Sequence, residues 1–381
     1  MASKKKIVLG AFVVAILSSV LTVTGLYLLL GLSTHKITDT MRFFGALRFI
    51  EEQYVNKVDD TKLIDGAIAG MVKSLDDPHS IYLNSAMYKD LMEHTEGSFG
   101  GIGVFMGFKD NVVTIVSIME STPGADAGLQ AGDEIVAVDG VLSSKMQPEE
   151  TAMKIRGDAG TNVVLTIRRA GSADTDYTIT RAVIKTHTVA HNMLPGDMGY
   201  IRIASFGENT SKEFREAYSD LEEKGMKGTI LDLRGNPGGL VTSCVDIGNL
   251  LVPKGEIVSV VQRDGTKEEH MSSLEKIKYP LVVLIDGGSA SAAEILAGAI
   301  QDTQAGTLVG AKSYGKGSVQ VVMPMYEGDA LKLTIAKYYT PSGRSIDGTG
   351  IEPDVAVVAD PNGQEDTQAL KAIEILKEKM Q

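Results

Sequence analysis

Asp286-Gly-Gly-Ser-Ala-Ser-Ala-Ala-Glu294 is the stretch that decides the fold, because it joins the apolar run Leu281 to Asp286 to a predicted helix. The apolar run is typical of a buried strand, and we expect the helix over Ala290 to Gln304. A serine at a helix start lies near the positive end of the helix dipole. The turn therefore presents Ser291 as a candidate nucleophile, with the Ala292 N–H free to face a developing oxyanion.

Ser291 also has a simpler interpretation as the N-cap of this helix, which is a common use of serine. Ser289 is the natural cap candidate in the same run. If Ser289 caps the helix, Ser291 is left without a capping role.

Lys316 lies in a second informative segment, Tyr314-Gly-Lys-Gly-Ser318, which leads into another predicted strand. A serine hydroxyl is a poor nucleophile until a base takes its proton. Lysine can be that base if burial lowers its pKa towards neutrality. In an extended chain Lys316, Ser318 and Gln320 share one face, so Gln320 could orient the amine. The pattern indicates a serine–lysine hydrolase, and the alternative is a lysine on a surface hairpin.

Two other catalytic motifs fit poorly. Residues 310–316 spell the first part of a P-loop, but Gly317 replaces the required Ser or Thr, and a strand follows where a helix is needed. A Ser-His-Asp triad has no Gly-x-Ser-x-Gly motif to support it. His79 lies in the turn-rich link Leu75 to Leu83, where a loop histidine bonded to backbone is the simpler interpretation than a catalytic base.

Asp232-Leu-Arg-Gly-Asn-Pro-Gly-Gly239 is a further glycine-rich loop, between the predicted buried strand Gly228 to Leu233 and the predicted helix Leu240 to Leu251. Its glycines free backbone N–H groups that could supply a second oxyanion donor. It can equally be a strand-to-helix turn, and the two interpretations are compatible. Strand and helix patterns alternate from residue 187 to 381, which predicts an α/β domain.

Residues 97–186 are rich in short β-like runs, and two segments there carry meaning. Glycines in Gly100-Gly-Ile-Gly-Val104 let backbone N–H groups form a nest for a carboxylate. In Thr122 to Gly140 a short helix ends at a glycine turn and runs into a strand. Together they resemble a PDZ domain, which binds a peptide C-terminus as an added strand; the alternative is a small β-domain whose glycines only make turns. The predicted peptide-binding residues are Gly101, Ile102, Gly103 and Val104.

Composition excludes several classes of protein. A net charge of −12 over 381 residues argues against nucleic acid as a partner. The single cysteine, Cys244, cannot form an internal disulfide and reads as a buried thiol. No Cys/His cluster has metal-ligand spacing, so we expect neither a metal nor another cofactor.

The N-terminus predicts a membrane anchor. Three lysines, Lys4 to Lys6, precede an uncharged run from Ile7 to Leu32 that is long enough to span a bilayer with some tilt. A cleaved signal peptide usually has a shorter apolar core, so we favour an uncleaved single-pass anchor in the cell membrane. The lysines then stay in the cytoplasm, and everything after about Ser33 is extracytoplasmic.

Seven ordered motifs, which cover nearly everything after the anchor, resemble the carboxyl-terminal processing proteases, the tail-specific, S41-type serine peptidases with a PDZ domain. The first three are Leu75 to Ser80, the PDZ segments and the loop at residues 232–239. The remaining four are Ser289 to Glu294, Tyr314 to Gln320, Tyr339 to Gly343 and Gly350 to Asp354.

The resemblance implies a role for each matching residue: Ser291 is the nucleophile, Lys316 the general base and Gln320 its positioning partner. It places oxyanion donors on the Ala292 backbone and on a glycine of the pair Gly238 and Gly239. It carries over Asp302 as a supporting catalytic residue. One departure is Ala293, where the family often has a third serine.

The resemblance also implies an architecture: a protease core similar to the crotonase-like α/β spiral, with an inserted PDZ domain and N-terminal helices. We divide the chain into an anchor (1–33), an N-terminal helical region (34–96), a PDZ domain (97–186) and a protease domain with a helical tail (187–381). Substrates would be the unfolded or flexible C-terminal segments of proteins. The family is often homodimeric, which makes a homodimer the expectation.

Two other classes of protein remain open. A membrane-anchored PDZ scaffold with an inactive protease-like domain would not need Ser291, Lys316 and Gln320 intact. A serine–lysine amidase or signal-peptidase-like enzyme would not need the PDZ segments. Cleavage of an unfolded protein, compared with Ser291→Ala and Lys316→Ala, separates these classes.

Overall fold

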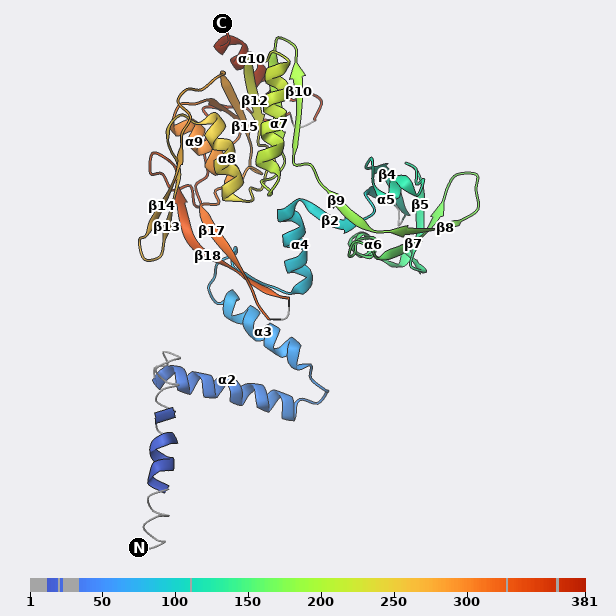
Figure 1. Cartoon of the computed structure of the whole chain (residues 1–381), viewed down its shortest axis with the longest axis vertical. Helices are drawn as coiled ribbons and strands as arrows, with labels where there is room; N and C mark the ends of the chain where they lie inside the picture. The colour runs from blue at the N-terminus through green and yellow to red at the C-terminus, as the bar shows by residue number, and fades with distance from the viewer. Residues whose placement is uncertain (1–11, 20, 23–33, 110–111, 327, 361–362) are drawn as a thin grey trace. The chain divides into compact units, whose positions relative to one another are not determined.

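The computed structural model describes residues 12–19, 21–22, 34–109, 112–326, 328–360 and 363–381. These residues fall into two compact units, Met1–Asp76 and Asp77–Gln381. In the first unit, α2 (Thr34–Gln53) and α3 (Asp60–Lys73) belong to the predicted helical region 34–96 (Figure 1).

The predicted anchor, Ile7 to Leu32, lies mostly outside the described residues. Within the part of the chain that is described, no helix combines the length and the apolar character needed to cross a bilayer. The single transmembrane helix and the cytoplasmic stub therefore stay predictions.

A six-stranded sheet forms the centre of the second unit, in the order β10-β11-β12-β15-β16-β19. Only β10 is antiparallel to its neighbour, and the other strands are parallel. Parallel neighbours need a crossover connection. Helices lie in the first three crossovers, as the strand–helix alternation of the sequence indicates, whereas the connection from β16 to β19 runs through two strands of a second sheet. The strands are β10 (Val189–Leu194), β11 (Met198–Ile203), β12 (Gly228–Asp232), β15 (Leu281–Ile285), β16 (Thr307–Gly310) and β19 (Val355–Ala356).

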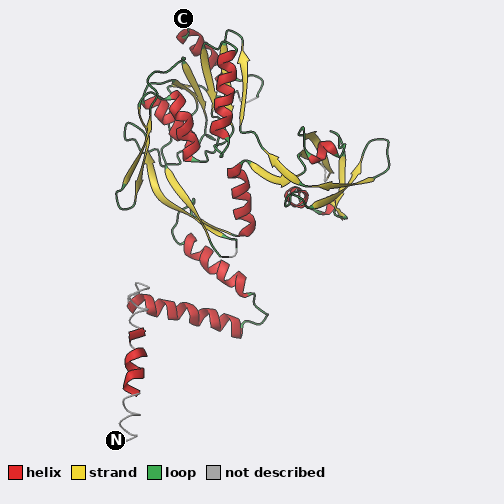
Figure 2. Cartoon of the chain, viewed as in Figure 1, coloured by secondary structure: helices red, strands yellow, loops and turns green. Residues whose placement is uncertain are grey.

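Helices cover both faces of this sheet (Figure 2). Successive strand residues point to opposite faces, so Leu231 and Val283 join one buried cluster and Ile230 and Val282 join another. The first cluster contains side chains of three helices, and the second contains Leu376 of the C-terminal helix. The three helices are α7 (Thr210–Glu223), α8 (Val241–Leu251) and α9 (Ala292–Asp302), and the C-terminal one is α10 (Thr367–Lys379).

A second, antiparallel sheet has the order β1-β18-β13-β14, with β17 paired to β18. The short strand β1 comes before the small β-domain in sequence, yet it pairs with β18 near the end of the chain. The small β-domain is thus inserted between segments of one sheet. The strands are β1 (Ile81–Leu83), β13 (Gly255–Gln262), β14 (Lys267–Ser272), β17 (Ser318–Pro324) and β18 (Ala330–Tyr339).

The small β-domain follows helix α4 (Ser85–Glu96). Its main sheet has the order β3-β4-β5-β7-β8, with β6 paired to β5, and a separate pair joins β2 to β9. Strand β3 therefore lies at an edge of the sheet. The strands are β2 (Ser98–Gly101), β3 (Val104–Lys109), β4 (Val112–Ile118), β5 (Glu134–Val138), β6 (Val141–Leu142), β7 (Asn162–Arg168), β8 (Thr175–Thr180) and β9 (Ala182–Lys185). Two α-helices, α5 (Pro123–Asp126) and α6 (Pro148–Ile155), and the 3-10 turn η1 (Ser143–Lys145) connect them.

Candidate active site

Ser291 ends the turn between β15 and α9 and occupies the N-cap position of α9. Its backbone has φ 55° and ψ −118°, a region that costs a residue with a Cβ about 1–3 kcal/mol. Such strain is typical of a nucleophile on a sharp strand-to-helix turn. The expectation that Ser289 caps the helix is wrong, because its Oγ donates to the Leu233 carbonyl at 2.8 Å and accepts the Asp286 N–H at 3.0 Å.

Gly238 packs directly against this turn. A Cβ on Gly238 would lie 2.6 Å from the Ser291 Cβ and 2.9 Å from the Ala292 nitrogen. Its φ of 96° also belongs to the region that favours glycine. Only glycine can bring the loop at residues 232–239 this close to Ser291.

Two backbone N–H groups at this contact, those of Ala292 and Gly239, have no acceptor among the residues that the structure describes. The Gly238 N–H instead donates to Asn236 Oδ1 at 2.8 Å. Of the two glycines that the sequence offers as oxyanion donors, Gly239 therefore has the available N–H.

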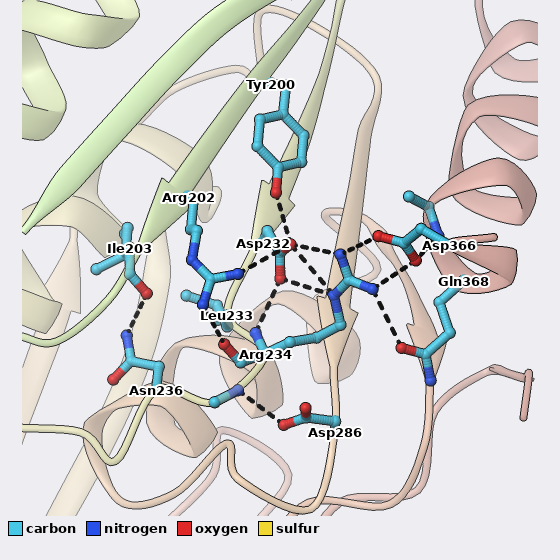
Figure 3. Close-up of polar contacts among 12 residues, drawn as sticks. Tyr200, Arg202, Ile203, Asp232, Leu233, Arg234, Asn236, Asp286, Asp366 and Gln368 are labelled. Atoms are coloured by element: carbon cyan, nitrogen blue, oxygen red, sulfur yellow. Dashed lines mark hydrogen bonds and ion pairs between the residues drawn. The ribbon is translucent and has the colours of Figure 1, made fainter. Parts of the chain in front are cut away.

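Further hydrogen bonds hold the loop at residues 232–239 in place. The Asn236 carbonyl accepts the Ala290 N–H of the Ser291 turn at 2.9 Å. Asn236 Nδ2 donates to the carbonyl of Ile203, at the end of β11, at 2.9 Å (Figure 3). The Asp286 carboxylate accepts the Gly235 N–H at 2.8 Å. These contacts fix the two loops as one assembly at the ends of β12 and β15.

Glu294, in the first turn of α9 and completely buried, joins the Ser291 turn to the lysine loop. Its carboxylate accepts hydrogen bonds from the N–H of Ser291 (2.9 Å), the Oγ of Ser313 (2.5 Å) and the N–H groups of Gly315 (2.7 Å) and Lys316 (2.8 Å). Hydrogen bonds to an ionised group are strong, and a buried carboxylate needs them. They hold residues 313–316 against the start of α9.

Tyr338, a buried residue of β18, makes a second link between the same two segments. Its hydroxyl donates to the carbonyl oxygens of Lys316 and Ser291, the latter at 3.1 Å. Burial raises the pKa of Tyr338 well above its usual value, so the phenol keeps its proton. Ser291 and Lys316 are therefore adjacent through contacts of their backbones.

The Lys316 ammonium makes no hydrogen bond or ion pair with any described residue, and that includes the hydroxyl of Ser291. Burial lowers the pKa of Lys316, and the positive charge of Lys332 lowers it further. Asp77 and Glu294 oppose this shift as nearby anions. An unpaired amine with a lowered pKa is the state that a general base requires.

Gln320 lies in β17 on the same face as Ser318, as the sequence predicts, since its Nε2 donates to the Ser318 Oγ at 2.9 Å. The same Nε2 donates to the Thr334 Oγ1 at 3.1 Å on the neighbouring strand. The structure does not join Gln320 to Lys316 by a hydrogen bond.

Asp302 is not brought to the site. It is the last residue of α9, about 16 Å along the helix axis from Ser291 at 1.5 Å per residue. Its carboxylate accepts the N–H of Ser342 at 3.0 Å, the Ser342 Oγ at 2.6 Å and a guanidinium N–H of Arg344. These contacts hold the segment after β18, and none of them reaches Ser291 or Lys316 directly. The supporting role that the resemblance implies for Asp302 stays a prediction.

The other catalytic motifs find no support in the fold. Residues 310–316 connect β16 to β17, so no helix follows the lysine as a P-loop requires. His79 donates its backbone N–H to the Asp77 carboxylate at 3.0 Å. His187 and His191 pair with carboxylates of α7 and not with Ser291.

In the small β-domain, Gly101 to Val104 form the turn from β2 to the edge strand β3. The Ile102 and Gly103 carbonyls accept the N–H groups of Gly124 (2.7 Å) and Met119 (2.9 Å). Their own N–H groups have no acceptor in the described part of the chain. This is the arrangement expected of a nest for a carboxylate beside an edge strand.

The loop at residues 232–239 is also tied to the C-terminal helix (Figure 3). Arg234 bonds through one guanidinium group to buried Asp232 (2.7 Å) and to Asp366 (2.7 Å), the N-cap of α10. Burial acts against the Arg234 charge, but the bonds to the two aspartates outweigh it and raise the pKa of Arg234. The Tyr200 hydroxyl donates a hydrogen bond to Asp232 at 2.7 Å. Burial is the larger cause and this bond the second that raise the pKa of Tyr200 to about 12.

Sequence reasoning missed Glu294, Tyr338 and Asn236. Glu294 stands three residues after Ser291, which is the spacing of a capping box and was a usable signal. Tyr338 and Asn236 act through contacts between distant segments, for which the sequence offers no local pattern.

Comparison with known proteins agrees with this organisation. Residues 197–357 match the family model of peptidase family S41, residues 114–169 match a PDZ domain, and residues 32–87 match the N-terminal domain of the activating protease CtpB.

Individual proteins are similar over most of the chain. The carboxy-terminal-processing protease of Bartonella bacilliformis is 43% identical over 83% of this chain and 74% of its own length. The carboxy-terminal processing protease CtpA of Bacillus subtilis is 40% identical over 90% of this chain and 75% of its own length. Among solved structures, the photosystem II D1 C-terminal processing protease matches with a TM-score of 0.51 and 29% identity, over 88% of this chain and 96% of that one.

Proposed function

This chain belongs to peptidase family S41, the carboxy-terminal processing serine proteases, and on that premise we propose that Ser291 and Lys316 are its catalytic pair. The observation that carries the proposal is the double link through Glu294 and Tyr338. It holds the backbones of Ser291 and Lys316 together while the lysine amine stays unpaired and partly desolvated.

Acylation begins when Lys316, in its neutral form, takes the proton of the Ser291 hydroxyl. The Ser291 Oγ forms a bond to the carbonyl carbon of a peptide, and the carbonyl oxygen becomes an oxyanion. Lys316 then gives its proton to the leaving amine as the C–N bond breaks. An ester on Ser291 and a new peptide N-terminus result.

Deacylation uses water in the same way. Lys316 removes a proton from water, the hydroxide attacks the ester, and the proton returns to Ser291 as the acid leaves. Catalytic hydrogen bonds are often long without substrate, so a direct Ser291–Lys316 bond need form only during reaction. Gln320, on the strand β17 that follows the lysine loop, is the positioning partner of Lys316 in this proposal.

The oxyanion donors in this proposal are the N–H groups of Ala292 and Gly239. The helix start and the glycine loop supply them without reorganisation, which is where such donors act best. Gly238 contributes differently: it allows the close approach and commits its own N–H to Asn236.

Substrate recognition is assigned to the PDZ domain. A C-terminal carboxylate binds the nest formed by Gly101, Ile102, Gly103 and Val104, and the peptide adds as a strand beside β3. The unaccepted N–H groups of Ile102 and Gly103 and the edge position of β3 support this role. The substrates are accordingly unfolded or flexible C-terminal segments of proteins.

We also propose the cellular setting and architecture that the sequence indicates. The uncharged run Ile7 to Leu32 behind Lys4 to Lys6 supports a membrane anchor with an extracytoplasmic protease. Exposed apolar side chains along α2, among them Met41, Phe44 and Phe49, support a homodimer contact. The strand order of the central sheet supports a crotonase-like spiral core, with the PDZ domain at 97–186 and the protease domain at 187–381.

The test of this function is cleavage of an unfolded protein by the soluble part, residues 34–381. We expect cleavage by the wild type and by Lys312→Ala, which removes an exposed lysine four residues before Lys316. We expect none with Ser291→Ala or Lys316→Ala. Equal cleavage by all four proteins would leave a PDZ scaffold as the better description, and cleavage of small amides alone would favour an amidase.

A further inference from the structure

The turn Asp77-Pro-His-Ser80 lies beside β18, the strand that pairs with β17, although it comes more than 200 positions earlier in the sequence. The Asp77 carboxylate closes the turn by accepting the His79 N–H at 3.0 Å and the Ser80 Oγ–H at 2.6 Å. Ser80 is only 5% exposed. A buried hydroxyl needs hydrogen-bond partners, and the partners of Ser80 show which segments it connects.

Ser80 connects this turn to β18. Its Oγ accepts the Thr334 N–H at 3.0 Å while it donates to Asp77. The following strand β1 pairs with β18 at Ile81 and Lys332, which fixes the turn in register against that strand. The Ser80 hydroxyl is therefore fixed against β18 at Thr334, where it accepts one hydrogen bond while it donates another to Asp77.

Thr334 connects β18 to Gln320. The two residues are cross-strand partners, and the register of the β17–β18 pair shifts at that point, between Val319 and Gln320. The Thr334 Oγ1 accepts the Gln320 Nε2–H at 3.1 Å. A bulge re-aims a side chain, and here the hydrogen bond to Thr334 sets the direction of the Gln320 amide.

Lys316 lies near two carboxylates, those of Asp77 and of Glu294 in α9, and near Lys332 of β18. The residue that faces Asp77 from within the turn is His79. Burial favours the neutral form of Asp77, but hydrogen bonds from Ser80, Thr334 and His79 outweigh it and lower the pKa of Asp77. Asp77 thus stays an anion, and its charge raises the pKa of Lys316 against the effects of burial and of Lys332.

We propose that Asp77 and Ser80 are positioning residues for the Gln320–Lys316 side of the active site: Ser80 fixes Thr334 and through it Gln320, and Asp77 holds Ser80 and places a negative charge near the lysine. The inference rests on the proposed role of Lys316 as general base. It gives the segment between the N-terminal helices and the PDZ domain a part in catalysis.

The test is the pH dependence of kcat and of kcat/KM for a fluorogenic peptide, measured on the full chain with Asp77→Asn and Ser80→Ala. Loss of the Asp77 charge lowers the lysine pKa, so we expect the acid limb of the Asp77→Asn profile to move to lower pH. We expect Ser80→Ala to lose about tenfold in kcat with KM unchanged, as one hydrogen bond to a positioned group is removed.

Asp76→Asn is the matched control, because the exposed neighbouring carboxylate makes no hydrogen bond or ion pair with a described residue through its side chain. It should keep the wild-type profile. Asp77→Asn changes almost no volume, so it tests the proposal even if Ser80→Ala fails to fold. Superimposable profiles of Asp77→Asn and wild type, with an inactive Lys316→Ala, would overturn this inference alone. An active Lys316→Ala with the wild-type profile would instead overturn the proposed function.

Discussion

At the residue scale, Ser291 is held in a backbone conformation that most residues avoid, and its neighbours make that conformation possible. Gly238 leaves the space, and Glu294 accepts the Ser291 N–H. Glu294 also accepts the Lys316 N–H, so one carboxylate positions both proposed catalytic residues. Strained residues persist only where surrounding contacts over-determine them, and here hydrogen bonds to one buried group do so.

Glu294→Gln tests this arrangement. An amide keeps one acceptor oxygen but turns a nitrogen towards N–H groups, so buried donors lose their partner. We expect a loss of about 3 kcal/mol in the free energy of unfolding, measured by urea denaturation. We also expect the protein that remains folded to cleave substrate more slowly than the wild type. Glu374→Gln, on the exposed face of α10, should stay within about 0.5 kcal/mol of the wild type. An unchanged unfolding midpoint for Glu294→Gln would contradict the proposed positioning.

At the element scale, the strands and helices of the core were largely predictable. The apolar runs of β12 and β15 are buried on both faces, and such strands are legible without knowing their neighbours. Strand β14, Lys267–Ser272, was not predicted, because its polar, mostly exposed residues lack an alternating pattern. The Ser289 cap was predicted wrongly because its hydroxyl goes to Leu233, a contact set by the pairing of distant strands.

Helix α10 is joined to the loop at residues 232–239 by Asp366, which caps the helix and binds Arg234. Asp366→Ala should therefore lower the free energy of unfolding by about 1 kcal/mol at pH 7. The bond to Arg234 lowers the pKa of Asp366 in the folded state, so the stabilisation is present above the unfolded pKa of about 3.9 and disappears as the pH falls through the lower folded value. Urea titrations of both proteins at pH 7 and at acidic pH measure this. If the difference in free energy of unfolding between the wild type and Asp366→Ala grows on acidification, the Asp366–Arg234 bond does not stabilise the fold in this way.

At the scale of the whole molecule, one chain combines a PDZ domain with a domain of peptidase family S41. The PDZ segments and the Ser291 turn could each be identified from local glycine and serine patterns. The contact of Asp77–Ser80 with β18 could not, because no local pattern pairs segments separated by an inserted domain. Asp302 is a mixed case: its place at the far end of α9 follows from its spacing along the predicted helix, but its bonds to Ser342 and Arg344 have no local pattern that predicts them.

Gly103→Val tests whether the PDZ domain recognises a C-terminal carboxylate. Gly103 has φ 75°, and an added Cβ would lie 2.5 Å from the Thr122 side chain, so the turn before β3 must distort. We expect fluorescence anisotropy to show binding of a labelled peptide with a free C-terminal carboxylate to the wild type and none to Gly103→Val. The same peptide with an amidated C-terminus should bind weakly to both proteins. Equal binding of the two peptides to the wild type would argue against carboxylate recognition by this turn.

The most direct measurement of the Ser291–Lys316 chemistry is the rate at which a fluorophosphonate modifies the protein as a function of pH, with the modified residue identified by mass spectrometry. We expect modification at Ser291 alone, at a rate that rises with pH through an apparent pKa below the usual lysine value of about 10.4, and no modification in Lys316→Ala. Modification of Lys316→Ala at the wild-type rate, or an inflection only near the usual lysine value, would contradict the assignment of Lys316 as the base.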